Sequence, residues 1–121
     1  MRSAFNPMGV KNNMKVWIGE TTNLSTGKWY SMNHNLNITD YTKIYVDGYA
    51  QFISNFKNWQ IGDIVPIYSL WGMNFRNFSV TVDANTIGFA TSDQISTNNK
   101  NTSNEGVNII SAIKIVLRIF Y

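Results

Sequence analysis

The chain has 121 residues, of which 44% are hydrophobic and 14% aromatic, so it is long and apolar enough for one domain with a packed core. Its net charge of +3 comes from ten cations spread along the chain, and without a basic cluster we expect no nucleic-acid partner. Disulfide and thiolate chemistry are excluded because there is no cysteine, and neither a signal peptide nor an apolar run long enough to insert into a membrane is recognisable.

The order of apolar runs and turns predicts an all-β protein. Residues 1–14 contain Pro7, Gly9 and three asparagines, which indicates a linker or N-terminal arm before a domain of residues 15–121. Strand-like runs recur about every dozen residues in that domain, which is typical of a single antiparallel β-sandwich, here predicted to be jelly-roll-like. The predicted strands are 15–20, 28–32, 42–50, 64–71, 77–83, 86–91 and 107–121.

Three connections can be interpreted more closely. Residues 83–85 lie between two strong strand patterns and predict a hairpin with a three-residue loop. Pro66 cannot donate a ladder hydrogen bond, so its strand is predicted to lie at a sheet edge or to contain a bulge. The longest polar stretch, 92–106, is predicted to be a flexible loop that links strands rather than carrying function.

The end of the chain, VNIISAIKIVLRIFY, has the period of a strand. Ile113, Ile115, Leu117 and Ile119 fall on one face, and the other face carries Lys114, Val116, Arg118 and Phe120. Such a strand must lie inside a sheet, because a free apolar edge would aggregate. We therefore expect it to be covered by this chain or by a neighbouring copy.

Catalytic and metal-binding patterns are absent from the sequence. His34 is the only histidine and is predicted to be a loop residue, whereas zinc sites use cysteines or several histidines. The seven carboxylates are separated along the chain, and most lie in turn sequences, where aspartate makes local hydrogen bonds. We therefore expect neither a cofactor nor enzymatic activity.

The aromatic residues suggest carbohydrate binding. Sugars present apolar C–H faces and hydroxyl rims, which suit an aromatic plane with a few polar groups beside it. The stretch LWGMNFRNF has this mixture just after a predicted strand; the predicted site residues are Trp71, Asn74, Phe75 and Arg76, with Tyr49 and Trp59 as the second choice.

These aromatic residues also have structural interpretations. Trp17 and Trp29 are predicted to fill the core, and the candidate site residues could pack in the same way. Arg76 would bind an acidic sugar or phosphate through its planar fork if it is functional. Alternatively, it is a solvated loop cation or pairs with an aspartate across a contact between subunits.

Three segments together resemble a known family. KVWIGE, NLNITDYTKIYVDGYA and the final IKIVLRIFY are similar to segments of the small C-terminal tip domains of bacteriophage tail fibres and receptor-binding proteins. The middle of the chain, 51–106, matches nothing in that pattern, and no binding residue is carried over. The matching residues are Trp17, Gly19, Leu36, Asp40, Tyr41, Ile44, Val46 and 113–121.

The resemblance implies a non-enzymatic tip domain at the end of a virion fibre. Such a domain would form a homotrimer and attach to a host cell-surface carbohydrate or another surface structure. Three alternatives stay open: a structural trimerisation cap, a free-standing bacterial lectin or adhesin, and a binder of single-stranded nucleic acid that uses aromatics and lysines.

Overall fold

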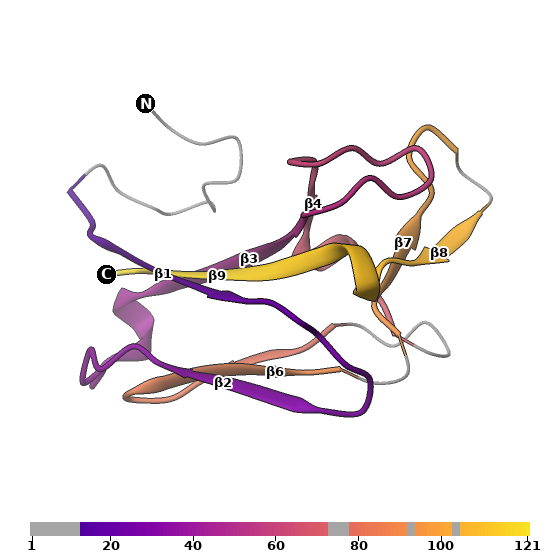
Figure 1. The fold of residues 1–121 in the computed structure, drawn as a ribbon. Helices are drawn as coiled ribbons and strands as arrows, with labels where there is room; N and C mark the ends of the chain where they lie inside the picture. The colour runs from indigo at the N-terminus through magenta and orange to yellow at the C-terminus, as the bar shows by residue number, and fades with distance from the viewer. Residues whose placement is uncertain (1–12, 73–77, 92–93, 103–104) are drawn as a thin grey trace.

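The computed structural model describes residues 13–72, 78–91, 94–102 and 105–121, and these form an all-β fold with antiparallel sheets (Figure 1). The predicted all-β class with antiparallel sheets is therefore confirmed. The four-stranded sheet has the order β1 (Val16–Thr21), β9 (Ile113–Phe120), β3 (Tyr45–Phe52) and β4 (Ile64–Pro66). The three-stranded sheet has the order β2 (Trp29–Asn33), β6 (Thr86–Ala90) and β5 (Val80–Val82). A third pair consists of β7 (Ser96–Asn98) and β8 (Gly106–Asn108).

The two larger sheets lie over one another, with β7 and β8 at one end of the molecule (Figure 1). The chain changes sheet between β1 and β2 and again between β2 and β3, and its last strand pairs with its first. Ile115 and Leu117 of β9 and Ile87 and Phe89 of β6 are each 0% exposed and belong to one core cluster. This connectivity places the apolar C-terminal strand at the centre of the fold.

Two sequence predictions about connections are confirmed. β4, which contains Pro66, lies at the end of its sheet, where a residue without an N–H can be tolerated. Residues 83–85 join β5 to β6 as a three-residue loop closed by a backbone hydrogen bond from Asp83 to Thr86 of 2.9 Å. The Asp83 carboxylate also accepts hydrogen bonds from the backbone N–H groups of Asn85 (3.0 Å) and Thr86 (2.7 Å).

Two predictions near the C-terminus are wrong. The expected strand 107–121 is two strands, because the 3₁₀ turn η4 (Ile110–Ala112) separates β8 from β9. The stretch 92–106 is not a plain linking loop, because it contains β7, whose Ser96 and Thr97 are buried. Hydroxyl side chains do not give the apolar alternation by which strands are recognised, so this strand was missed.

Two further stretches that were expected to be strand are 3₁₀ turns instead. η1 (Tyr41–Lys43) occupies the start of the predicted strand 42–50, and Asp40 caps it by accepting a hydrogen bond from the Thr42 backbone N–H. η2 (Ile67–Ser69) ends β4 well before the predicted residue 71. Within the part of the chain that the structure describes, no helix has the length and hydropathy needed to span a membrane.

The positions of two tryptophans follow from strand parity. Trp17 packs against the core as expected. Trp29 does not, and its predicted core position is wrong, because it is 57% exposed. In β2, Tyr30 and Met32 face the core, so Trp29 must point outward with Ser31.

Candidate functional site

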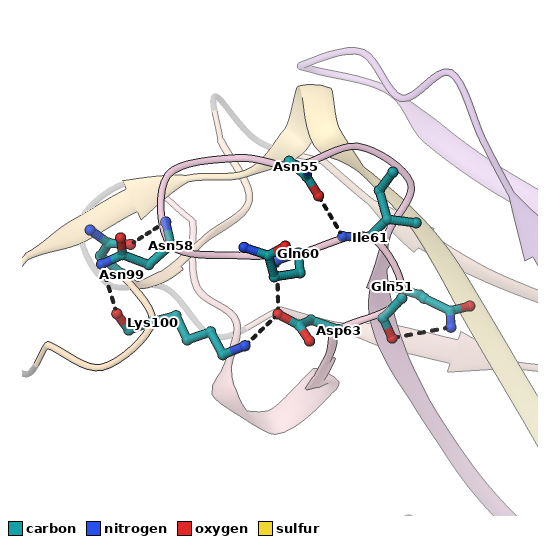
Figure 2. Close-up of polar contacts among 9 residues, drawn as sticks. Gln51, Asn55, Asn58, Gln60, Ile61, Asp63, Asn99 and Lys100 are labelled. Atoms are coloured by element: carbon teal, nitrogen blue, oxygen red, sulfur yellow. Dashed lines mark hydrogen bonds and ion pairs between the residues drawn. The ribbon is translucent and has the colours of Figure 1, made fainter.

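Two loops meet beside the edge strand β4 (Figure 2). One loop, 53–63, joins β3 to β4, and the other begins after β7 at residue 99. The side-chain amide of Asn58 donates a hydrogen bond of 3.1 Å to the backbone carbonyl of Lys100. The backbone N–H of Asn58 donates to Oδ1 of Asn99 over 3.4 Å. These bonds fix the two loops relative to each other, although they are more than 40 residues apart in the sequence.

Asp63 connects the same two loops through charge. Its Oδ2 lies 2.7 Å from Lys100 Nζ and also accepts a hydrogen bond of 2.9 Å from the Gln60 backbone N–H (Figure 2). The hydrogen bond from Lys100, followed by the one from Gln60, lowers the pKa of Asp63 below the ordinary value for aspartate. A second pair, Lys57 with Glu105, lies 3.5 Å apart. Both lysines of this region are thus balanced by carboxylates.

Trp59 is held rigidly in the first loop. Residues Phe56 and Trp59 exchange two backbone hydrogen bonds, of 3.0 and 2.8 Å, which close a tight turn. The indole stacks on Phe52, with ring centroids 4.9 Å apart and an interplanar angle of 8°. Lys100 Nζ lies 5.9 Å from the indole centroid, within reach of a cation–π attraction. The buried Nε1 of Trp59 has no acceptor among the described residues.

A cleft of about 280 Å³ lies next to Trp59, between β4 and the turn that follows β7. Its lining combines the indole and aliphatic surface from β4 with hydroxyl and amide groups. The polar residues that line it include Ser69, Thr97, Asn98, Asn101 and Thr102. Such a lining offers an aromatic ring for stacking and neutral groups for hydrogen bonding. Lys100, the one cation among the described lining residues, is already paired with Asp63.

The three predicted site residues that the structure describes, Tyr49, Trp59 and Trp71, do not all line one cleft. Trp59 borders the cleft, but the ring of Tyr49 lies on the outer face of the four-stranded sheet, 5.6 Å from the guanidinium carbon of Arg118. Trp71 is half-buried and exchanges two backbone hydrogen bonds with Ser96, of 3.0 and 2.8 Å. Asn74, Phe75 and Arg76 lie outside the described residues.

A second hollow lies beside the predicted stretch 70–78. It measures about 380 Å³ and is lined by Ile67, Tyr68, Leu70, Phe78 and Val80, so its described lining is mostly apolar. Tyr68 is 86% exposed at its rim. Among the described residues of its lining there is no amide side chain and only the phenolic hydroxyl of Tyr68, so this hollow is the weaker candidate for a sugar.

Sequence reasoning missed the polar half of the cleft. Thr97, Asn98 and Asn101 lie in the stretch that was predicted only to link strands. The available signal was the density of amides in STNNKNTSN, which exceeds what a simple linker needs. Nothing in the local sequence shows that this stretch lies against Trp59, because that contact depends on the pairing of β7 with β8.

The only histidine, His34, holds two parts of the fold together. It is 5% exposed, and its Nε2 lies 3.0 Å from the carbonyl oxygen of Asp83, while the Leu36 backbone N–H donates to Nδ1 over 3.0 Å. It therefore ties the segment after β2 to the 83–85 hairpin. Among the residues that the structure describes, no group of three histidine, cysteine or carboxylate side chains could hold a metal ion.

Comparisons with known proteins give no further identification: no family model, no curated protein and no solved structure matches the chain.

Proposed function

We propose that this chain is a non-enzymatic receptor-binding tip domain that recognises a host cell-surface carbohydrate through the cleft beside Trp59. The observation that carries the proposal is the combination in one cleft of a rigid indole with hydroxyl and amide side chains. A pyranose offers a C–H face to the indole and hydroxyls to the amides, so each part of the lining has a matching group. The resemblance of the first and last segments to phage tail-fibre tips supports placing this function at the end of a virion fibre.

The buried indole N–H of Trp59 adds to this argument. An unpaired buried donor costs about 1–3 kcal/mol, so such groups are uncommon away from sites that bind water or ligand. Because Phe52 holds the ring in place, the donor cannot turn freely to solvent. A bridging water, or a ligand hydroxyl admitted by a shift of the atoms that cover Nε1, would satisfy it.

The proposal includes assembly into a homotrimer, as the resemblance implies. The outer face of the four-stranded sheet supports a contact between copies, because Val16 and Ile18 of β1 are 45% and 54% exposed there. Beside them, β9 places Arg118 on the same face, and Arg118 is paired with Asp47 of β3. Burying this apolar edge against a neighbouring copy would remove it from water.

The binding test is a glycan array probed with the labelled domain, covering neutral and acidic glycans of bacterial surfaces. The wild type is expected to bind, and Trp59→Ala is expected to weaken binding about tenfold, the equivalent of ~1.4 kcal/mol for a lost aromatic contact. Tyr41→Ala, an exposed aromatic of η1 that does not line the cleft, is the matched control and should bind like the wild type.

Two outcomes would contradict the proposal. Wild-type binding that survives in Trp59→Ala would place the site elsewhere, and Arg76→Ala would be the next variant to measure. Failure of the wild type to bind any glycan, with a native circular dichroism spectrum, would favour the second candidate function. That candidate is a structural trimerisation cap, which the exposed Val16 and Ile18 also support.

A further inference from the structure

The outer face of the three-stranded sheet carries an exposed aromatic plane. Trp29 of β2 is 57% exposed although it lies in a regular strand. A Cβ placed on Gly88 of β6 would lie 2.6 and 3.1 Å from the indole atoms Cζ2 and Cε2, so the ring lies across Gly88. Gly88 is accordingly buried although it has no side chain of its own. The indole therefore covers Gly88, while more than half of the Trp29 surface stays open to solvent.

The outward-facing residues of the ladder around this ring are small and uncharged. In the ladder, Ser31 pairs with Gly88, which pairs in turn with Thr81 of β5. Hydroxyls thus lie on both sides of the glycine that supports the indole. The remaining outward positions of the paired strands are Asn33, Thr86 and Ala90. We call Trp29, Gly88 and these five neighbours the Trp29 platform.

The composition of the Trp29 platform argues against a macromolecular partner. A stable protein interface buries about 800 Å² on each partner, and its centre is rich in apolar and aromatic side chains. The platform has one large apolar side chain and is otherwise small and polar. Nucleic acid would need cations near the ring, and none of the seven residues is charged.

The same composition suits a neutral sugar. An uncharged face matches an uncharged ligand, a flat indole matches the C–H face of a pyranose, and hydroxyls on either side match its equatorial hydroxyl groups. We infer that the Trp29 platform is a second carbohydrate subsite, which takes a sugar ring of a neutral glycan stacked on Trp29. This inference rests on the proposed function, since it assumes that the domain binds glycans at all.

The test is titration calorimetry of the full chain with neutral oligosaccharides, using chitohexaose, cellohexaose, maltohexaose and the neutral glycans retained on the array. The variants are Trp29→Ala, Trp29→Phe, Trp59→Ala and the double alanine variant. We expect Trp29→Ala to lower affinity about tenfold or to remove one binding site, Trp29→Phe to retain part of the binding, and the double variant to bind nothing. Circular dichroism checks that the exposed substitution leaves the fold intact.

Each result separates the two sites. Binding that is the same in Trp29→Ala as in the wild type, with loss in Trp59→Ala, overturns the platform and leaves the cleft. Loss in Trp29→Ala with unchanged binding in Trp59→Ala supports the platform and overturns the cleft as the receptor site. If the wild type binds none of the neutral probes, the inference of a subsite on the Trp29 platform is wrong. Binding to acidic glycans alone would then indicate a different site.

Discussion

At the scale of single residues, three of the four tryptophans lie against a glycine. An added Cβ on the glycine would lie between 2.3 and 3.1 Å from the nearest indole atom in each pair. The pairs are Trp17 with Gly19, Trp29 with Gly88, and Trp71 with Gly106. The Trp-x-Gly spacing near the start of the domain is thereby explained by packing, because residues two apart in a strand share a face. Trp59 differs, since it stacks on another ring.

Gly48 offers a sharp test of packing at this scale. A Cβ there would lie 2.7 Å from a methyl of Leu117 and 2.8 Å from the backbone carbonyl oxygen of Val116, and the backbone atom cannot move aside easily. Gly48→Ala is expected to lower the free energy of unfolding by about 1–3 kcal/mol, as overpacked cores do. Urea denaturation measures it, with Thr22→Ala, an exposed substitution, as control. Equal stability of Gly48→Ala and the wild type would show that the sheet is looser than described.

A pH dependence follows from the turn aspartates. Hydrogen bonds from Asn85 and then from Thr86 lower the pKa of Asp83 below its ordinary value of about 4. A carboxyl whose pKa is depressed by folding contributes stability above its unfolded pKa and loses that contribution as the pH falls through the folded value. The free energy of unfolding should therefore decrease between about pH 5 and pH 2.

Asp83→Asn isolates this effect, because the amide keeps an acceptor oxygen at the same place but does not titrate in this range. The variant should show a shallower decrease in stability with falling pH than the wild type in urea denaturation. Identical slopes for the two proteins would mean that the hairpin carboxylate does not contribute, leaving Asp40 and Asp63, whose pKa values are lowered in the same direction by their own hydrogen bonds.

At the scale of elements, β9 organises the fold. It pairs with β1 on one side and β3 on the other, and Ile113, Ile115, Leu117 and Ile119 are all at most 1% exposed. The sequence predicted both the strand and its apolar face. Its second face is more buried than the alternation of cations and apolar residues suggested: Arg118 is 7% exposed and pairs with Asp47, with its Nε 2.7 Å from Oδ1. That pair depends on the β3–β9 register, which no local pattern encodes.

Truncating or deleting the side chains of β9 should therefore strongly lower the stability of the fold. Leu117→Ala is expected to lose about 2–5 kcal/mol of stability, a large part of the ~5–15 kcal/mol typical of a domain. Deleting residues 113–121 should leave no soluble folded protein. Chemical denaturation and circular dichroism measure the two variants, and a deletion variant with a native spectrum would show that the strand is dispensable.

The elements that sequence reasoning missed share a physical cause. Strand β7 has hydroxyl side chains at its buried positions, and the turn η4 interrupts an apolar run without a glycine or proline to mark the break. Trp59 is a candidate from the sequence because an aromatic residue in a polar loop stands out, whereas Thr97 and Asn98, which also line the cleft, are residue types common in any polar stretch. Only the pairing of β7 with β8 places them at the cleft.

At the scale of the whole molecule, assembly is the first consequence to measure. The proposed homotrimer should give a mass of about three times 13.8 kDa by light scattering. Ile18→Glu places a charge at the exposed apolar edge of β1 and should yield a folded monomer, whereas Ile61→Glu, at an exposed position in the 53–63 loop, should remain trimeric. A wild-type monomer at micromolar concentration would contradict the assembly.

If aromatic surfaces of this domain recognise carbohydrate, as we propose, then glycan binding should change the tryptophan indole N–H signals in an NMR spectrum. The four tryptophans give four such signals in a ¹⁵N-labelled sample, assigned by single substitutions. On addition of a glycan retained by the array, the signal of Trp59 should shift. If that glycan is neutral, the signal of Trp29 should shift as well. The signal of Trp17, which packs against the core, should not change. If no indole signal moves under saturating glycan, or if only that of Trp71 moves, recognition through the cleft beside Trp59 is contradicted.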